Sequence, residues 1–389
     1  MEPSPRSYLD HNATSALRPQ AAEAVLRALS LPGNASSVHA EGRAARAAIE
    51  AAREQVAALV GAAAKNVVFT SGGTESSATV LSPALRRPGG ASARLLLVGA
   101  AEHPCVLDGH RFPADAVERI PVDANGIVDL AWLEARLGRA EGPVLVSIQA
   151  ANNETGVLQP VAEAARVVRA AGGLLHSDAV QVAGKVPVNM AALGADVLTL
   201  SAHKLGGPKG VGAIVLASEG VEIADRLLRG GGQERGARAG TENVAAIAGF
   251  GAAAEAAREA MTEDAARIRG LRDELEAVLG RIAPDAVIFG AGVERLPNTV
   301  AFAVPGLRAE TALIAFDLAG VAVSSGSACS SGKVKRSHVL QAMGVEPALA
   351  EGAIRVSLGW NSTKEDVFRF AKACESVLRS LYQRRANAA

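Results

Sequence analysis

The stretch from Asp196 to Gly212 reads Asp-Val-Leu-Thr-Leu-Ser-Ala-His-Lys-Leu-Gly-Gly-Pro-Lys-Gly-Val-Gly. Its apolar run from Val197 to Leu200 predicts a short strand buried in the core. The segment Ser201-Ala-His-Lys204 follows at once, and a turn of glycine and proline comes next. Because ligands of open α/β sheets bind at the carboxyl ends of the strands, this hydroxyl, imidazole and amine are expected at a binding site.

These three side chains have the chemistry of a pocket for pyridoxal phosphate (PLP). Lys204 can form a Schiff base with an aldehyde, and Ser201 and His203 can contact a phosphate. On this stretch alone, a loop lysine that merely caps the strand is an equally good interpretation. The rest of the chain has to decide between the two.

The composition bounds the class of protein. The chain has 389 residues, 49% of them hydrophobic, and at roughly 100–200 residues per domain it is expected to form two domains. Lys+Arg and Asp+Glu both number 40, so the net charge argues against partners such as nucleic acid or anionic membrane. Aromatic residues make up only 3%, which argues against stacking on single-stranded nucleic acid.

The cysteines and the N-terminus indicate the compartment. Cys105, Cys329 and Cys374 are too few and too dispersed for a disulfide framework, and no Cys-x-x-Cys pair suggests a zinc site. The N-terminus has no apolar segment like that of a signal peptide, and no uncharged apolar run is long enough to cross a bilayer. We expect a soluble, cytoplasmic protein without a metal.

Strand and helix patterns alternate from residue 67 to residue 216, which predicts a mostly parallel sheet with helices on both faces. Two predicted helices precede the first of the predicted strands. The predicted helices are 19–29, 41–60 and 160–171, and the predicted strands are 67–70, 94–98, 144–148, 173–176 and 197–200.

Polar residues follow several of these strands. Gly73 and Thr74 lie where a strand passes into a helix, a geometry that cradles phosphate, although a plain turn explains a Gly-Gly pair equally well. His103 follows the next strand and could lie flat on a planar ring, or it could be an ordinary loop histidine. Asn153, in Ala151-Asn-Asn-Glu-Thr-Gly156, suits a ring oxygen or a carboxylate, and it also suits a turn.

Asp178 follows the strand at 173–176 among apolar neighbours. A carboxylate there needs a cationic partner to stay ionised, and a pyridinium N–H is such a partner. Gln181 lies three residues further on and could reach the hydroxyl of the same ring if the turn is helical.

The segment from Leu228 to Asn243 is rich in glycine and contains three arginines. It is either a solvated linker or a mobile loop that binds an anion, and its length and charge favour the second interpretation.

The last third of the chain indicates a second domain. An amphipathic helix is predicted over 252–282, followed by strand-like 298–304, a helix over 309–318 and strand-like 321–324. The stretch 324–332 then has no bulky apolar residue, so Cys329 is predicted on an exposed loop, where a lone thiol is a liability unless it is used. Cys374 falls on the apolar face of the last helix.

Arg355 lies in a strand predicted over 354–358, between Ile354 and Val356. By strand alternation it points away from both of them. It could bind a substrate carboxylate with its two-pronged guanidinium, or it could form a surface ion pair.

With these motifs in order, the chain resembles the cysteine desulfurases of the NifS/IscS type, within the class V aminotransferase-like PLP enzymes. The resemblance runs from Tyr8 to about Leu358. Four motifs carry it jointly, namely Ser201-Ala-His-Lys204 with Gly206-Gly-Pro-Lys-Gly210, Ala151-Asn-Asn-Glu-Thr-Gly156, Gly230-Gly-Gly-Gln-Glu-Arg235 and Ser324-Ser-Gly-Ser-Ala-Cys329.

The resemblance implies a PLP-dependent transferase fold of the aspartate aminotransferase-like type. A large PLP-binding domain with a mostly parallel sheet would span 14–251. A smaller α+β domain, made of 1–13 and 252–389, would carry the loop of Cys329.

The resemblance also implies roles for individual residues. Lys204 would bind PLP covalently, Asp178 would hold the ring nitrogen protonated, Gln181 would bond the ring hydroxyl and His103 would stack on the ring. The phosphate would be held by Gly73, Thr74, Ser201 and His203. Thr241 would reach the phosphate of the neighbouring subunit, in a homodimer with shared active sites. The substrate carboxylate would be held by Asn153 and Arg355.

The implied reaction takes L-cysteine to L-alanine. Lys204 would remove the Cα proton, and the Cys329 thiolate would attack the substrate sulfur and keep it as a persulfide. The sulfur would then pass to an acceptor protein, such as an iron–sulfur scaffold. Two small departures from the family pattern are Ser77, where Asn is common, and Ser15, where Thr is common.

Three other interpretations remain at this point. The first is a different PLP enzyme, such as a selenocysteine lyase, an aminotransferase or a kynureninase-like hydrolase, none of which explains Cys329 as well. The second is a sulfur-relay protein without catalysis, against which the set of Lys204, Asp178 and His203 speaks. The third is a metal hydrolase using histidines, which lacks any recognisable spacing of ligands.

Overall fold

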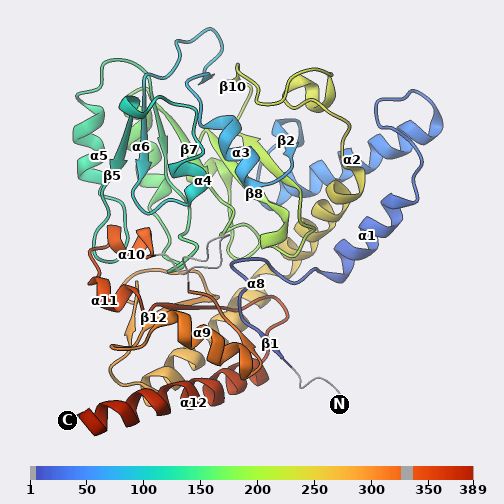
Figure 1. Cartoon of the computed structure of the whole chain (residues 1–389). Helices are drawn as coiled ribbons and strands as arrows, with labels where there is room; N and C mark the ends of the chain where they lie inside the picture. The colour runs from blue at the N-terminus through green and yellow to red at the C-terminus, as the bar shows by residue number, and fades with distance from the viewer. Residues whose placement is uncertain (1–5, 326–335, 389) are drawn as a thin grey trace.

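The structure is a computed structural model that describes residues 6–325 and 336–388. Its centre is a seven-stranded sheet (Figure 1) with the strand order β2-β9-β8-β7-β6-β4-β5. Neighbours from β8 to β5 pair in parallel, and β9 is antiparallel to both of its neighbours. The strands are β2 (Val67–Thr70), β4 (Leu95–Gly99), β5 (Val117–Ile120), β6 (Val144–Ser147), β7 (Leu174–Asp178), β8 (Val197–Ser201) and β9 (Gly212–Leu216).

Successive side chains of a strand point to opposite faces of the sheet. Both faces therefore carry apolar side chains, and helices cover both. Val144 and Val146 of β6 join the apolar cluster on one face, and Leu145 joins the cluster on the other. The first face is covered by α2 (Ala40–Leu59), α5 (Leu130–Leu137), α6 (Val161–Ala170) and the beginning of α8 (Val244–Ile282). The second is covered by α3 (Gly73–Val80) and α4 (Pro104–Leu107). The mostly parallel sheet between two helical layers is therefore confirmed.

A second apolar core lies below the large sheet in Figure 1. It is built on three antiparallel strands, β11 (Val287–Ile288), β12 (Thr299–Ala303) and β14 (Ile354–Ser357). The helices α9 (Ala309–Leu318) and α12 (Lys364–Ala388) cover them, and the rings of Phe316 and Phe370 stack in the core with centroids 5.6 Å apart. Cys374 is buried in this core, as its position in the last helix predicts.

The N-terminal strand belongs with this second core. β1 (Ser7–Tyr8) pairs in parallel with β13 (Val321–Ala322), and Leu9 packs in the second apolar cluster. The chain then passes to α1 (Pro19–Leu29), which lies beside α2 and α8. The segment between β1 and α1 therefore crosses from one core to the other, directly beside the candidate site described below.

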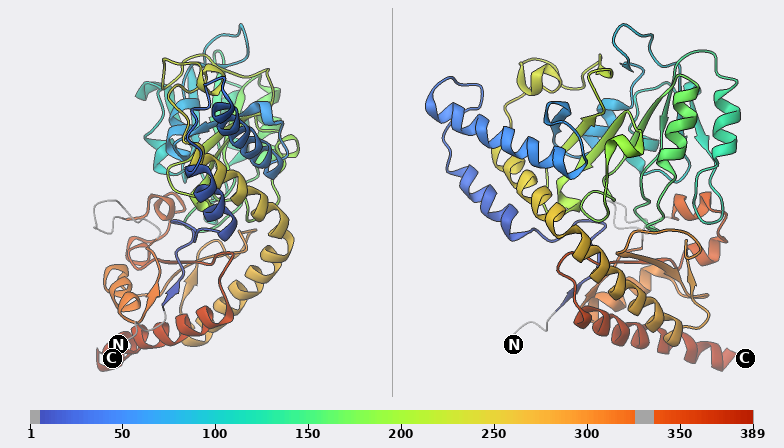
Figure 2. Two further views of the ribbon diagram at one scale, coloured as in Figure 1. Left: turned by 90° about the vertical axis from the view of Figure 1, so that its right-hand side faces the viewer. Right: turned by 180° about the vertical axis from the view of Figure 1, so that it is seen from behind.

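Helix α8 is longer than the sequence pattern predicts. It begins at Val244 rather than at residue 252, and its first turn is capped by the Asn243 side chain, which accepts a hydrogen bond of 3.1 Å from Ala246 N. Its first half packs in the first core and its second half in the second (Figure 2). The domain boundary predicted at residue 251 lies inside this continuous helix and stays a prediction.

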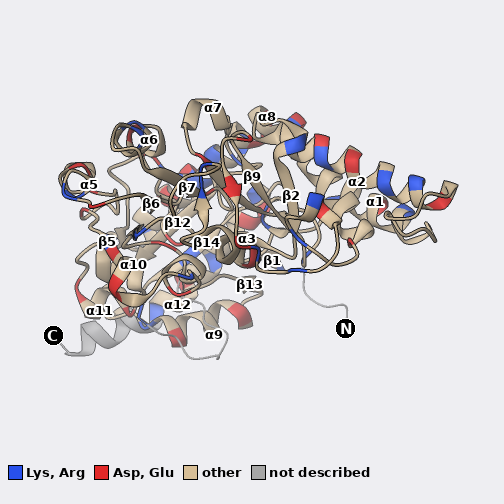
Figure 3. Ribbon diagram, turned by 90° about the horizontal axis from the view of Figure 1, so that it is seen from above, with Lys and Arg blue, Asp and Glu red and all other residues tan. Residues whose placement is uncertain are grey.

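The other predicted elements are found within a few residues of their expected bounds, and α1 and α9 match them. The strand expected over 321–324 is only two residues long. The remaining elements are short: β3 (Leu85–Arg86), β10 (Glu222–Ile223), α7 (Met190–Leu193), α10 (His338–Ala342), α11 (Pro347–Ala350) and four 3₁₀ turns at 64–66, 114–116, 202–204 and 233–236. Both basic and acidic side chains lie along α2 (Figure 3). No helix in the described part of the chain combines the length and apolarity needed to cross a membrane.

The glycine-rich segment 228–243 is anchored to the sheet. Glu234 is buried and forms a bidentate ion pair with buried Arg53 of α2, with N–O distances of 2.7 and 2.9 Å. It also accepts a hydrogen bond of 2.8 Å from Phe69 N. Glu234 and Arg235 both have positive φ, at 48° and 56°, a strained conformation that surrounding contacts must hold.

The three arginines of this segment all lie near carboxylates. Arg229 pairs with Asp225, Arg235 lies 3.7 Å from Glu50, and Arg238 lies 3.0 Å from Glu75. Binding of an anion by this segment stays a prediction.

We expect Glu234→Ala to lower the free energy of unfolding by about 3–5 kcal/mol, because it removes the buried partner of the Arg53 guanidinium and leaves only the half-exposed Glu50 beside it. Urea denaturation measures this difference. Glu219→Ala is the matched control, since Glu219 forms an exposed ion pair with Lys65 that should contribute little. Equal, small effects of the two substitutions would contradict the assigned role of the buried pair.

Candidate active site

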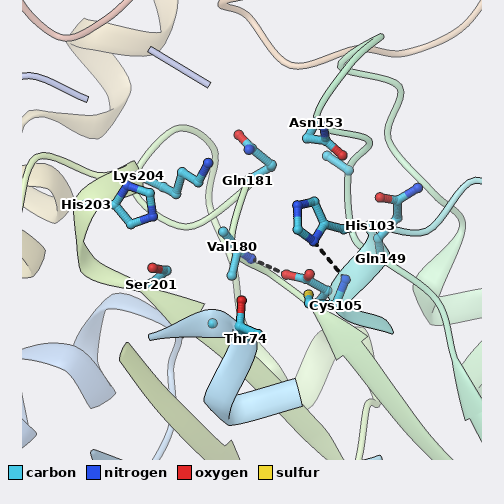
Figure 4. A pocket seen from close by; sticks show the side chains of 13 residues that line it. Thr74, His103, Cys105, Gln149, Asn153, Val180, Gln181, Ser201, His203 and Lys204 are labelled. Atoms are coloured by element: carbon cyan, nitrogen blue, oxygen red, sulfur yellow. Dashed lines mark hydrogen bonds between the residues drawn. The ribbon is translucent and has the colours of Figure 1, made fainter. Parts of the chain in front are cut away.

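A cavity of about 240 Å³ opens at the carboxyl ends of the parallel strands (Figure 4). Its walls come from the ends of β4, β6, β7 and β8 and from the beginning of α3. The lining residues are Gly73, Thr74, His103, Cys105, Gln149, Ala151, Asn153, Asp178, Val180, Gln181, Ser201, His203 and Lys204. Eight residues that the sequence analysis placed in a PLP pocket with Lys204 are thus brought together with it around one cavity.

Lys204 reaches this cavity because β8 ends in a tight turn. Residues 202–204 form a 3₁₀ turn, and Gly207 folds back on it so closely that a Cβ there would lie 2.9 Å from the Ala202 Cβ. Only glycine permits that approach. The Lys204 Nζ donates to two backbone carbonyls of the N-terminal segment, Asn12 O at 2.6 Å and Ala13 O at 2.8 Å.

The environment of Lys204 shifts its amine toward the neutral form. Burial and the positive charge of Arg355 lower the pKa of Lys204 to about 8. A neutral amine is the form that attacks an aldehyde and accepts a proton. This environment fits a Schiff-base lysine better than a lysine that only caps a strand.

Asp178 is the last residue of β7, rather than lying in the segment after the strand as the sequence pattern predicts. Its carboxyl is buried, and among the described residues its hydrogen bond comes from Val180 N at 2.9 Å. Burial raises the pKa of Asp178 to about 6. A positively charged N–H in the cavity would therefore find a carboxylate that lacks a close cationic partner.

We expect Asp178→Ala to weaken PLP binding about 10- to 100-fold, the range for loss of a hydrogen bond to a charged group. Equilibrium titration of the cofactor, followed by its absorbance, measures this change. Asp196→Ala is the control, because Asp196 precedes β8 away from the cavity and binds Leu175 N at 2.8 Å. An unchanged affinity of the Asp178→Ala variant for PLP would contradict the proposed contact of Asp178 to the ring nitrogen.

His103 projects into the cavity from the segment after β4. Its Nδ1 accepts a hydrogen bond of 3.1 Å from Cys105 N and so caps α4. Burial, Lys204 and His338 lower the pKa of His103 to about 4. The imidazole is therefore neutral at physiological pH, with one face available to a planar ligand.

The N-terminus of α3 lies at one side of the cavity. Gly73 and Thr74 are the first residues of this helix, and its dipole favours an anion there. Ser201 and His203 lie beside them, and an adjoining cavity of about 410 Å³ is also lined by these four residues and by Lys209. Burial and the nearby lysines Lys204 and Lys209 lower the pKa of His203 to about 4.

Gln181 lies on the turn after β7, with its amide near Lys204 (Figure 4). Its Nε2 donates to Asn12 O at 3.0 Å, and its Oε1 accepts from Lys185 Nζ at 2.7 Å. Sequence reasoning missed both partners. The four-residue spacing of Gln181 and Lys185 on a tight turn was the available signal for Lys185, whereas nothing in the sequence around Asn12 distinguishes that residue.

Asn12 connects the site to the second core. Its backbone N donates to Ser357 Oγ at 2.9 Å and its Nδ2 donates to Thr299 Oγ1 at 2.9 Å. Its Oδ1 accepts from Asn298 Nδ2 at 3.0 Å and from Lys185 Nζ at 3.0 Å. Every polar atom of Asn12 is thereby used, since its carbonyl accepts from Lys204 and Gln181, and the residue joins β12 and β14 to the turns after β7 and β8.

Arg355 lies at the edge of the site and is buried rather than exposed. Its guanidinium donates to Asn153 O at 3.0 Å and to Asp10 Oδ1 at 2.7 Å. The ion pair of the alternative interpretation is present, with a buried Arg355 and a partly exposed Asp10. Binding of a substrate carboxylate by Arg355 stays a prediction. The Arg355 Nε is also buried, and the described residues offer it no acceptor.

Three predicted site residues are not among those that line the cavity, namely Arg355, Thr241 and Cys329. Thr241 is exposed on the segment before α8, and its contact to a neighbouring subunit stays a prediction. Cys329 lies outside the described residues. The cavity is also lined by four residues that the sequence analysis did not assign, Cys105, Gln149, Ala151 and Val180.

The thiol of Cys105, which lines the cavity, is expected to be unreactive. Burial and the nearby carboxyl of Asp178 raise the pKa of the Cys105 thiol to about 12. Since the thiolate is the nucleophile, this thiol is a poor candidate for catalysis. In the part of the chain that the structure describes, no three His, Cys, Asp or Glu side chains are grouped closely enough to hold a metal ion.

The donor set fits PLP part by part. Lys204 offers an amine for the aldehyde, Asp178 offers a carboxylate for the ring nitrogen, and Gln181 offers an amide for the ring hydroxyl. The beginning of α3, with Ser201 and His203, suits the phosphate. The cradle is tight, because a Cβ at Gly73 would lie 3.1 Å from the Val180 Cγ2.

Comparison with known proteins agrees with this fold and site. The sequence pattern of the class V aminotransferases matches residues 7–370. The chain therefore belongs to the class V aminotransferase family.

The similar proteins within that family include cysteine desulfurases and NifS-like proteins. The chain is 43% identical to a cysteine desulfurase of Cereibacter sphaeroides over 383 residues, which cover 97% of this chain and 96% of the relative. It is 38% identical to the cysteine desulfurase NifS of Azotobacter vinelandii, over 96% of this chain and 93% of the relative. The X-ray structure of a NifS-like protein from Rickettsia africae ESF-5 superimposes with a TM-score of 0.87 at 36% identity, covering 96% and 99% of the two chains. The resemblance inferred from the motifs is confirmed, and so is the predicted fold class.

Proposed function

We propose that this chain is a PLP-dependent cysteine desulfurase, which converts L-cysteine to L-alanine and holds the released sulfur as a persulfide on Cys329. One observation carries the proposal. In a chain 43% identical to a cysteine desulfurase, an amine of lowered pKa and a buried carboxyl line the same cavity. The cofactor, the residue roles and the partners are parts of this proposal.

The cofactor would be held by residues that line the cavity and its rim. Lys204 binds its aldehyde, Asp178 its ring nitrogen, Gln181 its ring hydroxyl and His103 its ring face. Gly73, Thr74, Ser201 and His203 hold its phosphate, with Thr241 contributed across a homodimer. When bound, PLP supplies an electron sink for the carbanion at the substrate Cα.

The chain's own residues would then carry out binding and proton transfer. Asn153 and Arg355 hold the carboxylate of L-cysteine, with Asp10 keeping the Arg355 fork in place. Lys204, once displaced by the substrate amine, removes the Cα proton, and a pKa near 8 suits a base at physiological pH.

Cys329 would perform the sulfur transfer. Its thiolate attacks the substrate sulfur, so that one S–S bond forms while the C–S bond breaks. The electron pair of the broken bond stays with the substrate Cβ, which takes up a proton and becomes a methyl group. Lys204 would return a proton to Cα, which gives L-alanine. A second thiol, on an acceptor protein, then takes the sulfur from Cys329.

The acceptor would be a protein of sulfur delivery, such as an iron–sulfur scaffold in the cytoplasm. The two NifS names among the relatives and structures support this class of partner. The acceptor must present a thiolate to the Cys329 persulfide, because exchange of sulfur requires a nucleophilic thiol.

The test incubates the purified chain with PLP, L-cysteine and a small dithiol as reductant, and measures alanine and sulfide. We expect the two products in equal amounts. Production of alanine only from L-selenocysteine would instead favour a selenocysteine lyase. Transfer of the amino group to a 2-oxo acid, without sulfide, would favour an aminotransferase.

A further inference from the structure

A second lysine lies beside the candidate site and has no role in the function proposed above. Lys185 is on the turn after β7, four residues from Gln181. Its Nζ donates to Gln181 Oε1 at 2.7 Å and to Asn12 Oδ1 at 3.0 Å. Within the described residues, these hydrogen bonds go to neutral amide oxygens rather than to a carboxylate. Burial, Lys204 and Arg355 lower the pKa of Lys185 well below its ordinary value.

The partners of Lys185 are held in fixed orientations. Asn12 donates through Nδ2 to Thr299 and accepts through Oδ1 from Asn298, so its oxygen must face Lys185. Gln181 donates through Nε2 to the carbonyl of Asn12, so its oxygen also faces Lys185. A neutral amine has two N–H groups and an ammonium has three, so Lys185 can satisfy both oxygens in either protonation state.

This arrangement decides which atom of Gln181 meets a ligand. An amide NH₂ has two hydrogens, and only one of those on Gln181 is needed by the Asn12 carbonyl. Because the Gln181 oxygen is bound to Lys185, the second N–H is the group left for a ligand in the cavity that Gln181 lines. Rotation of the amide by half a turn would instead present an oxygen, which repels an anionic ring oxygen.

We propose that Lys185 is a positioning residue that fixes the Gln181 amide, so that an N–H rather than an oxygen faces the ring oxygen of PLP. The inference rests on the proposed function, since it needs PLP in the cavity. It adds Lys185 to the Asn12 carbonyl, which accepts from Gln181 Nε2, as the second contact that holds this orientation of the amide.

The substitution Lys185→Met tests this role, because methionine keeps most of the side-chain length and removes the donor. We expect PLP to bind about three- to tenfold more weakly, the equivalent of part of one hydrogen bond. We also expect the visible absorption maximum of the bound cofactor to shift, since its ring oxygen loses a fixed donor. Lys65→Met, at an exposed lysine, is the control and should bind PLP as the wild type does.

A double-mutant cycle separates positioning from a merely structural role. In a Gln181→Leu background, Lys185→Met should change the PLP dissociation constant by less than about twofold, because the amide that Lys185 positions has been removed. Thermal unfolding of the ligand-free variants checks that each is folded. If Lys185→Met does not fold, Lys185→Gln, which keeps an N–H donor, enters the same cycle and should retain most of the wild-type affinity and spectrum.

The outcomes distinguish a failure of the proposed function from a failure of the role proposed for Lys185. A folded wild-type chain that takes up no PLP would overturn the proposed function. A wild type that binds PLP, together with a Lys185→Met variant of unchanged affinity and spectrum, would overturn only the role of Lys185. An equal loss of affinity in the wild-type and Gln181→Leu backgrounds would overturn it as well.

Discussion

Lys204→Ala should form alanine from L-cysteine at least about 10³-fold more slowly than the wild type. General-base catalysis by a positioned side chain contributes about 10²- to 10⁴-fold, and the same substitution removes the covalent link to the cofactor. The variant should also lose PLP during gel filtration, whereas the wild type should keep it. Alanine release, measured by chromatography, and the absorbance of the eluted protein provide the two readouts.

Two comparisons make this prediction specific. Lys65→Ala removes an exposed lysine that pairs with Glu219 and should keep wild-type turnover and cofactor. Added methylamine, a small primary amine, should restore part of the lost turnover to Lys204→Ala, because it can replace the missing amine in the vacated space. Turnover of Lys204→Ala above one-tenth of the wild-type rate would mean that another group is the base.

Cys329→Ser should slow the release of sulfide from L-cysteine at least about 10²-fold, because a hydroxyl cannot replace a thiolate as the nucleophile toward sulfur. PLP binding should be unchanged, which distinguishes this variant from Lys204→Ala. Mass spectrometry of the wild type after one turnover should find one added sulfur atom on the peptide with Cys329 and none in the variant.

The other two thiols cannot take over this role. Burial raises the pKa of both Cys105 and Cys374 to about 12, so each is almost fully protonated at physiological pH. Cys374→Ala should therefore keep its turnover, although it removes a buried core side chain. Persistent sulfide release by Cys329→Ser, at a rate near that of the wild type, would refute the assigned nucleophile.

Most of the site can be predicted from the sequence because its reactive side chains lie at the ends of strands. Runs such as Val197–Leu200 are short, apolar and closely followed by glycine, so the ends of the strands can be located within a residue or two. Once the strands are known to be parallel, Lys204, Asp178 and His103 must emerge at one edge of the sheet. The structure brings them to one cavity for that reason.

The parts that sequence reasoning missed depend on contacts between distant segments. Asn12 becomes important only because the N-terminal segment passes between the two cores, and Lys185 only because the turn after β7 folds against that segment. Glu234 was expected on a solvated or mobile loop, yet Arg53, 181 residues away in the chain, holds it in the interior. No local pattern of polarity encodes such pairs.

The start of α8 was missed for a local reason. Residues 244–251 are mostly alanine and glycine, with no charged residue to define an amphipathic stripe. Hydrophobic periodicity therefore becomes readable only further along the chain, where Met261 and Ile268 alternate with charged residues. The Asn243 cap was the available signal, since asparagine is among the preferred residues at that position.

The central claim is tested most directly by trapping the cofactor on the chain. Borohydride reduces an imine to a stable secondary amine, so that proteolysis and mass spectrometry can locate a bound pyridoxyl group. The account predicts the adduct on the peptide that contains Lys204 and on no other lysine. An adduct on Lys185 or elsewhere, or a folded, PLP-saturated chain without any adduct, would contradict it.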